Sequence, residues 1–278
     1  MQRLTRTVLA WLLVGVAAPC VADQKPLWEV GFGLFALTSP DYRGSDVSRL
    51  YLLPLPYITY HGEYFKADRD GVYGRLFRSP RVHLDLSFDA GVPVNSAKNE
   101  ARQGMPNLDP VFEVGPSLEI CIWHDCDSDV VLQLRLPARA VFSTDFTSID
   151  SHGGTFHPHL NLDLKHLGPG DDWNIGISAG PLYATEGYHD YYYQVDPQYA
   201  TPARPAYNAH GGYSGTRATF TVSRRFGQAW FGAFARYDDL AGAAFEDSPL
   251  MRISHSFMAG FSIAWVFAKS DELVDVRD

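Results

Sequence analysis

The sequence predicts an all-β fold: a single antiparallel barrel of about twelve strands, or ten as the alternative, that spans a membrane. Three observations predict it. Apolar and polar residues alternate along runs of about ten residues, helical periodicity is nearly absent, and short connections alternate with long ones. The 278 residues include 17 Phe, 15 Tyr, 6 Trp and 24 Gly, a composition that favours strands and turns. No shift in composition marks a linker, so we expect one domain.

Residues 1–22 have the pattern of a secretory signal peptide. Arg3 and Arg6 precede an apolar run from Val8 to Ala18, and Ala22 offers a small residue for cleavage before Asp23. The run is too short for a membrane-spanning helix, and no later stretch approaches about 20 uninterrupted apolar residues. We therefore expect export and a mature chain that begins near Asp23.

The stretch from Arg81 to Pro93 shows the alternation clearly. Even positions such as Leu84 and Leu86 are apolar, whereas odd positions such as Asp85 and Asp89 are polar or charged. An apolar outer face with a polar inner face is what a transmembrane barrel requires, whereas a soluble sandwich or lipocalin-like barrel would reverse the faces. Read in this way, the sequence predicts strands near residues 27–37, 51–60, 62–69, 72–79, 81–93, 110–123, 128–142, 154–167, 172–185, 213–226, 228–238 and 253–267.

The connections between these strands alternate in length. Tight turns separate the long ones, and short periplasmic turns with long extracellular loops are typical of outer-membrane barrels. If the short strands 62–69 and 72–79 fold as one irregular excursion, the count is ten. We expect the barrel to occupy residues 23–267, followed by a charged periplasmic tail at 268–278. A disordered stub is favoured for that tail over a partner-binding segment.

The strand parity also places charged side chains inside the barrel. Their signs nearly cancel, so cross-strand pairs can fill a narrow interior, and a small diffusion channel or ligand-binding barrel is the alternative. The predicted lumen charges are Asp85, Asp89, Arg135, Arg139, Asp163, Arg217 and Arg236, together with Glu29, Arg81, Glu113, Glu119, Lys165, Arg225 and Asp238.

The net charge argues against one class of partner. Removing Arg3 and Arg6 leaves 23 − 2 = 21 basic residues against 32 acidic ones. A nucleic-acid-binding protein would carry a basic patch, so no nucleic acid is expected.

Short motifs along the whole chain resemble the MipA/OmpV family of outer-membrane proteins. Residues 39–46 (SPDYRGSD) follow the first strand, residues 114–117 (VGPS) lie within 110–123, and residues 247–250 (DSPL) precede the last strand. No single motif is specific, but their order and spacing are. The resemblance assigns a family motif to Tyr42, Gly44, Ser45, Asp247, Ser248 and Pro249.

The resemblance implies a barrel in the outer membrane of a Gram-negative cell, in contact with its lipid. For the namesake of the family it implies a scaffold between a murein lytic transglycosylase and a bifunctional murein synthase. It implies no catalytic residue, no metal and no cofactor.

Serine and histidine do occur close together, but their arrangement argues against an enzyme. Within residues 254–256 (SHS), strand geometry places His255 on the face opposite both serines, so the base cannot reach a nucleophile. Ser151 and His152 lie in an unconstrained loop. A lipid hydrolase is therefore the least favoured function.

A weak metal site is a second alternative to a purely structural lumen. His157 and His159 share a face, with Asp163 four residues further on, and this set could bind a metal weakly. Because Lys165 and a polar lumen surround them, a hydrogen-bonded role is favoured instead.

Loop 186–212 is the candidate contact surface. It contains Tyr188, Tyr191, Tyr192 and Tyr193, and tyrosine-rich loops provide amphipathic contact area at low entropic cost. The loop could equally be a self-packed lid.

Two cysteines remain after cleavage, because Cys20 leaves with the signal peptide; a lipoprotein signal at Cys20 is disfavoured by the preceding Ala18-Pro19. Cys121 and Cys126 lie near a tight turn in an oxidising compartment, at a spacing that suits a disulfide. A metal clip through His124 would need reduced thiols, so the disulfide is expected.

Overall fold

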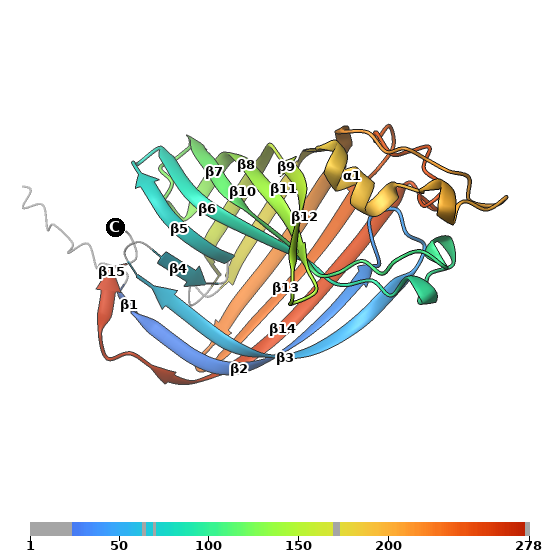
Figure 1. Ribbon diagram of the computed structural model, residues 1–278. Helices are drawn as coiled ribbons and strands as arrows, with labels where there is room; N and C mark the ends of the chain where they lie inside the picture. The colour runs from blue at the N-terminus through green and yellow to red at the C-terminus, as the bar shows by residue number, and fades with distance from the viewer. Residues whose placement is uncertain (1–23, 63–64, 69–70, 169–172, 276–278) are drawn as a thin grey trace, which may run out of the picture.

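The computed structural model describes residues 24–62, 65–68, 71–168 and 173–275, so the predicted signal peptide lies outside the described residues. Within them, a 13-stranded antiparallel sheet curls into a barrel (Figure 1). β9 and β10 both pair with β8 on one side and with β11 on the other. These pairings close the sheet, and β9 and β10 together occupy one strand position in it. The 13 described strands therefore fill 13 − 1 = 12 positions in the wall.

The strands of the wall follow one another in chain order. They are β2 (Trp28–Pro40), β3 (Ser48–His61), β4 (Phe65–Asp68), β5 (Gly71–Arg78), β6 (Val82–Gly91), β7 (Val111–Trp123), β8 (Val130–Thr144), β9 (Ile149–Phe156), β10 (His159–Leu167), β11 (Trp173–Ala184), β12 (Gly212–Phe226), β13 (Ala229–Asp239) and β14 (His255–Lys269).

The predicted fold class is confirmed, including the short pair β4 and β5. One predicted strand, 154–167, is split at Pro158, which has no N–H to donate to a ladder. Its first half, β9, already begins at Ile149, inside the predicted long loop.

The outer face of the wall is apolar, as the alternation predicts. Leu52 is 62% exposed, Phe261 44% and Trp265 58%, and all three occupy outward positions. Exposed side chains of this kind suit contact with lipid. Among the described residues, no helix combines the length and apolar character needed to cross a membrane.

The two ends of the barrel differ (Figure 1). At the terminal end, β1 (Gln24–Pro26) pairs with β15 (Leu273–Asp275) in a small separate sheet. The expectation of a disordered tail is therefore wrong for the part up to Asp275, and the last strand of the wall runs to Lys269 instead of Phe267. Backbone pairing with β1 is what orders this segment.

At the opposite, loop end lie η1 (Ser96–Lys98), η2 (Glu100–Arg102), α1 (Glu186–Tyr193) and η3 (Pro197–Tyr199). The sequence analysis missed α1, because its residues (EGYHDYYY) have no clear apolar stripe. Packing among the loops supplies the stabilisation that local periodicity does not.

The wall is incomplete on one side. β3 pairs with β2 over its whole length, but β4 pairs with β3 only at Tyr60 and His61. β5 pairs with β6 no further toward the loop end than Leu86. Within the described residues, Ser48–Thr59 of β3 and Ser87–Gly91 of β6 therefore face a gap, which we call the notch.

Candidate functional site

The lumen gathers charged side chains from strands on opposite sides of the wall. Asp238 on β13 accepts hydrogen bonds from Arg217 on β12 at 2.9 Å and from Arg43 in the β2–β3 loop at 3.0 Å. Arg139 on β8 lies 3.9 Å from Asp89 on β6. These side chains form a belt of opposite charges across the upper lumen.

The belt extends through longer contacts. Arg139 is 4.0 Å from Glu113, and Arg217 is 4.0 Å from Asp89. Arg236 differs from these arginines: among the described residues, its buried Nε finds no hydrogen-bond acceptor, and its guanidinium has no carboxylate within 4.0 Å.

A second charged group lies nearer the terminal end. Arg135 donates to Asp163 at 3.0 Å and lies 3.5 Å from Glu119, and Asn161 donates to the same Asp163 carboxylate at 2.8 Å. The weak metal site that the sequence analysis disfavoured, at His157, His159 and Asp163, is not among the candidate metal-binding groups of the described residues, and the two imidazole rings stack at 4.5 Å.

Asp85 takes part in a group that sequence reasoning missed. His83, Asp85 and Glu119 are buried, and one ligand atom from each lies within 4.8 Å of the others. The sequence contained a pattern that could have predicted this group. His83 and Asp85 share a strand face, and Glu119 is the cross-strand partner of His83. Glu119 also contacts Arg135, so this group belongs to the charged network of the lumen.

The parity prediction fails for one residue. Arg81 lies outside the lumen, in the turn between β5 and β6, where it contacts Asp125 at 2.9 Å with both side chains more than half exposed. Strand parity does not apply there, because β6 begins only at Val82.

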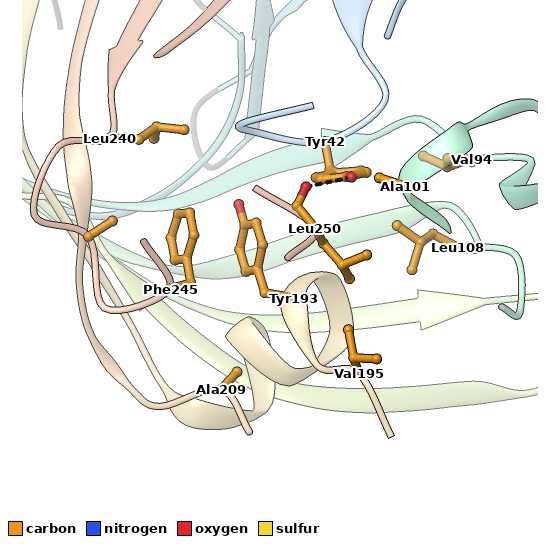
Figure 2. Close-up of a cluster of buried hydrophobic side chains, with 11 residues drawn as sticks. Tyr42, Val94, Ala101, Leu108, Tyr193, Val195, Ala209, Leu240, Phe245 and Leu250 are labelled. Carbon is orange, nitrogen blue, oxygen red and sulfur yellow. Dashed lines mark hydrogen bonds between the residues drawn. The ribbon is translucent and has the colours of Figure 1, made fainter. Parts of the chain in front are cut away.

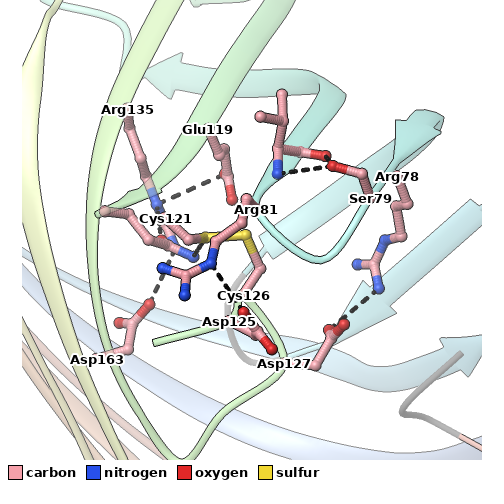
Figure 3. The surroundings of a disulfide bond; sticks show 12 residues. Arg78, Ser79, Arg81, Glu119, Cys121, Asp125, Cys126, Asp127, Arg135 and Asp163 are labelled. Atoms are coloured by element: carbon pink, nitrogen blue, oxygen red, sulfur yellow. Dashed lines mark hydrogen bonds and ion pairs between the residues drawn. A yellow bond between two sulfur atoms is a disulfide. The ribbon is translucent and has the colours of Figure 1, made fainter. Parts of the chain in front are cut away.

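The turn after β7 is held by a disulfide (Figure 3). Cys121 and Cys126 are bonded, with 5.4 Å between their Cα atoms. The backbone N–H of Cys126 donates to the carbonyl of Pro80 at 2.9 Å, so the turn packs against the β5–β6 turn. The ion pair between Arg78 and Asp127 spans the same two turns.

Loops 41–47, 92–110, 185–211 and 240–254 pack together at the loop end and form what we call the cap (Figure 2). The ring of Tyr193 stacks on Phe245 with centroids 3.7 Å apart, and the Tyr42 hydroxyl donates to the carbonyl of Leu250 at 2.8 Å. The buried residues of this cluster are Tyr42, Val94, Ala101, Leu108, Tyr193, Val195, Ala209, Leu240, Ala243, Phe245 and Leu250.

The family motif maps onto the cap. The Ser248 hydroxyl donates to the carbonyl of Tyr193 at 2.8 Å, and Ser45 is buried against Asn99. Gly44 adopts φ +85°, a conformation that favours glycine, and its N–H donates to Ser256. Two motif residues, Asp247 and Pro249, stay at least partly exposed. The two distant motif segments therefore meet in one structure.

The tyrosines of the candidate contact loop contribute to the cap. Tyr188 and Tyr193 are buried, so they are not available as a contact surface, whereas Tyr191 and Tyr192 are half-buried. Burial raises the pKa of Tyr188 to about 12, so its hydroxyl stays neutral. These positions favour the self-packed lid, because the aromatic side chains of the loop pack against one another and against the roof of the lumen.

His189 on α1 links the cap to the fully paired part of the wall. Its Nδ1 donates to the carbonyl of His210, which leaves Nε2 to accept from the Ser214 hydroxyl at 3.0 Å. Burial lowers the pKa of His189, so the ring is neutral in this arrangement.

No Ser–His arrangement predicted from the sequence assembles a catalytic site. His255 is exposed at an outward position, whereas Ser256 is buried and accepts from Gly44. His152 instead contacts Ser143 at 2.8 Å, a pair that sequence reasoning missed. Within the described residues no carboxylate hydrogen-bonds to His152, so a third group to orient the imidazole is missing from this pair.

Among the cavities lined by described residues, two lie in the lumen around these groups. One of about 340 Å³ is lined by Arg135, Asp163 and Trp230 among others, and one of about 290 Å³ lies below the tyrosines of the cap. Arg236 lines both cavities, together with Phe35 and Phe234.

Comparisons with known proteins identify a family and several similar chains. A model of the family described as "MltA-interacting protein MipA" matches residues 32–267. The outer membrane protein OmpV of Vibrio cholerae is 23% identical over 214 residues, which cover 75% of this chain and 76% of that protein. Outer membrane protein Omp26La of Vibrio anguillarum is 22% identical over the same shares. Among solved structures, a NanC porin covers 84% of this chain and 98% of its own, with 9% identity and a TM-score of 0.39.

Proposed function

We propose that this chain, which belongs to the MltA-interacting protein MipA family, is a docking protein of the outer membrane for murein-remodelling enzymes. The observation that carries the proposal is the packed loop end of the barrel. A cap with its own buried core, above a lumen crossed by ion pairs, suits a fixed scaffold better than a wide aqueous pore.

The partner class is suggested by the family name, MltA-interacting protein, and by what the family resemblance implies for its namesake. A murein lytic transglycosylase and a bifunctional murein synthase act on the periplasmic side of the membrane, so docking would use the terminal end of the barrel. In this orientation the β1–β15 sheet and the disulfide-bonded turn face the periplasm, and the apolar outer wall contacts lipid.

Crosslinking in intact envelopes tests the proposal. We expect the full chain to capture a lytic transglycosylase or a murein synthase. A variant that ends after Lys269, and so lacks β15, should capture less, while Phe146→Ala at the loop end should capture as much as the wild type. Absence of both enzymes from the crosslinked material, at normal expression and normal folding, would contradict the docking function.

The two lumenal cavities support a second candidate, a small diffusion channel. Planar-bilayer recordings distinguish the two functions. Steady single-channel conductance from the folded protein would favour the channel, whereas an electrically silent barrel would favour docking.

The boundaries of the mature chain remain part of the proposal. We expect residues 1–22 to be removed as a signal peptide and the mature protein to begin near Asp23. N-terminal sequencing checks this, and recovery of an acylated Cys20 would make the chain a lipoprotein instead.

A further inference from the structure

We propose that the lumen binds an amphipathic anion with an acyl chain and a single carboxylate, which enters from the lipid phase through the notch and places its carboxylate at Arg236. This inference goes beyond the docking function and does not rest on it. Four features of the described residues carry it: an edge that stays unpaired, a boundary at each end of that edge, a cavity behind it, and a buried guanidinium with no carboxylate within 4.0 Å.

Two prolines lie on the edge of β3 that faces the notch, and they disfavour pairing with another strand there. Pro54 and Pro56 lie two residues apart, so both place their missing N–H on the same side of the strand. The register with β2 runs through both prolines without interruption, so that side faces the notch. Proline on an edge disfavours the addition of another strand, which argues against a second copy of the chain at this position.

The notch is bounded above and below. The β4–β5 hairpin borders it at the terminal end. At the loop end, Asn99 donates to Asp41 at 2.9 Å, and Arg49 donates to the carbonyl of Lys98 at 3.0 Å. These contacts tie the loop after β6 to Asp41, which directly follows β2, and to β3, so they hold the loop end of the notch.

The frame is apolar on the β3 side. Leu52 on the outward face is 62% exposed and Leu55 on the inward face is 45% exposed. Most strands of the wall carry polar residues inside, but the inward positions in the middle of β3 hold Tyr51, Leu53, Leu55 and Tyr57, and the polar Arg49 and Thr59 come only at the two ends of this stretch. An acyl chain can therefore cross this edge without leaving an apolar surface.

The cavity of about 290 Å³ lies directly behind the notch. It is lined on one side by Phe35 and Leu37 of β2, and on the other by the end of β6 around Asp89 and Ala90. Its floor and roof are mostly apolar or aromatic, with Phe234, Met258 and Tyr192 among the lining residues. These residues suit a hydrocarbon body, and the charged members of the lining are Asp41, Arg43, Asp89 and Arg236.

Arg236 supplies the recognition of charge. The belt around the cavity contains four guanidinium groups, from Arg43, Arg139, Arg217 and Arg236, and three carboxylates, from Asp89, Glu113 and Asp238, so 4 − 3 leaves one positive charge. Asp41 also lines the cavity, but it is paired with Arg49 at 2.6 Å, so this pair does not change the balance. Arg236 is the arginine of this belt without a carboxylate within 4.0 Å among the described residues, and its buried Nε has no acceptor there. A buried charge of this kind is stabilised by a counterion, and one surplus charge matches one carboxylate.

A fluorescent 18-carbon acid, cis-parinaric acid, tests the site on the folded full-length mature protein in a non-ionic detergent. We expect saturable binding by the wild type and binding at least about tenfold weaker for the methyl ester of the same acid and for Arg236→Gln. Arg252→Gln, which removes a half-exposed arginine of the cap, is the matched control and should bind like the wild type.

Folding of each variant is checked by the change of gel mobility on heating. Loss of the unpaired Arg236 charge leaves the ion pairs of the belt intact, so Arg236→Gln should fold. Equal affinity of Arg236→Gln and wild type, or equal affinity for the acid and its ester, would overturn the site.

A diazirine-bearing fatty acid tests the route in lipid bilayers. On illumination we expect labelled peptides that contain Leu53 and Leu55 of β3 and Phe35 of the lumen, in addition to outward residues. Labelling confined to outward residues such as Phe261 would overturn entry through the notch. Labelling of Phe35 without labelling of β3 would equally overturn that route.

Discussion

Backbone N–H groups within a membrane need hydrogen-bond partners, and the two sides of the barrel wall meet this requirement in different ways. On the closed side, β13 pairs along its whole length with β12 and with β14, so its backbone donors are used within the sheet. On the notch side, β3 has a complete partner only in β2. There the chain removes two donors with Pro54 and Pro56, and bonds another, the Ala90 N–H, to the Asp89 side chain at 2.9 Å.

The difference shows two features that accompany the open edge: some of its backbone donors are removed or bonded locally, and neighbouring structure borders both of its ends. In hydrocarbon each unpaired backbone group costs several kcal/mol, so an open edge without these features would not persist. The cap and the β4–β5 hairpin hold the two ends of the notch, and the closed side needs neither.

The largest expected effect on folding comes from proline substitutions, which should distinguish the closed side of the wall from the notch side. Ala235→Pro on β13 should abolish folding, because it removes a ladder bond and distorts a strand paired on both sides, a cost of about 3 kcal/mol or more. Leu53→Pro on β3 should be similarly damaging, since its N–H points to β2. Leu52→Pro should be tolerated within roughly 0.5 kcal/mol, since its N–H faces the notch.

The change of gel mobility on heating, after refolding into detergent, measures the outcome. If Leu52→Pro unfolds the barrel as completely as Leu53→Pro, both sides of β3 are paired and the notch is closed.

The cap is the next region to test, because it fixes the loop end of the notch. Tyr193→Ala removes a fully buried ring that stacks on Phe245, and truncation of such a ring costs about 3–5 kcal/mol. We expect the loops to become sensitive to protease while the wall keeps its heat-dependent gel mobility.

Phe146→Ala is the control for the cap, since Phe146 is 88% exposed at the tip of another loop. It should leave the pattern of cleavage unchanged. Loops that resist protease in Tyr193→Ala as well as in the wild type would show that the cap does not depend on this stack.

The disulfide fixes the terminal end of the notch side, where the turn after β7 packs against the β5–β6 turn (Figure 3). Cys121→Ser should lower stability modestly, by roughly 2 kcal/mol, because the loop it closes is short. Insertion into membranes and docking should survive. Mass measurement after alkylation without reductant checks the bond itself, and two alkylated cysteines in freshly isolated protein would show that it is absent.

The sequence predicted the wall well because alternation along a strand is a local property. The run around Leu84 and Asp85 places its strand in the structure as expected, whereas the run around Leu162 and Asp163 lies in β10, one part of a predicted strand that is divided at Pro158. Pro54 and Pro56 also carried a local signal for an unpaired edge, which became interpretable only once the pairing of β3 was known.

The cap could not be predicted in the same way. Tyr42, Val94, Tyr193 and Leu250 come from four loops, and each is buried only because the other three loops pack against it. A tyrosine-rich loop therefore has the same sequence pattern whether it is a contact surface or a lid. Arg236 lines both described cavities of the lumen, but the absence of a carboxylate within 4.0 Å of its guanidinium among the described residues depends on distances that no sequence pattern encodes.

The smallest expected effect is a change in the stability of the cap with pH. It arises at His189, where the cap contacts the closed side of the wall. Burial lowers the pKa of His189, Arg43 acts in the same direction, and the hydrogen bond to the His210 carbonyl opposes them. Because the folded-state pKa lies below the unfolded value of about 6.5, the unfolded cap binds more protons as the pH falls past 6.5. The stability of the cap should therefore be complete above about pH 6.5 and decrease below it.

Protonation would also convert Nε2 of His189 from an acceptor of the Ser214 hydroxyl into a second donor, next to the Arg43 guanidinium. Limited proteolysis of the loops at pH 8, 6.5 and 5 should show increasing cleavage, while the wall remains folded. His189→Gln cannot titrate, so it should lose roughly 1 kcal/mol at every pH and abolish the pH dependence. His255→Gln, at an exposed outward position, should keep it. If His189→Gln retains the wild-type pH profile, another group controls the acid sensitivity of the cap, and the link between α1 and the closed side is not set by this imidazole.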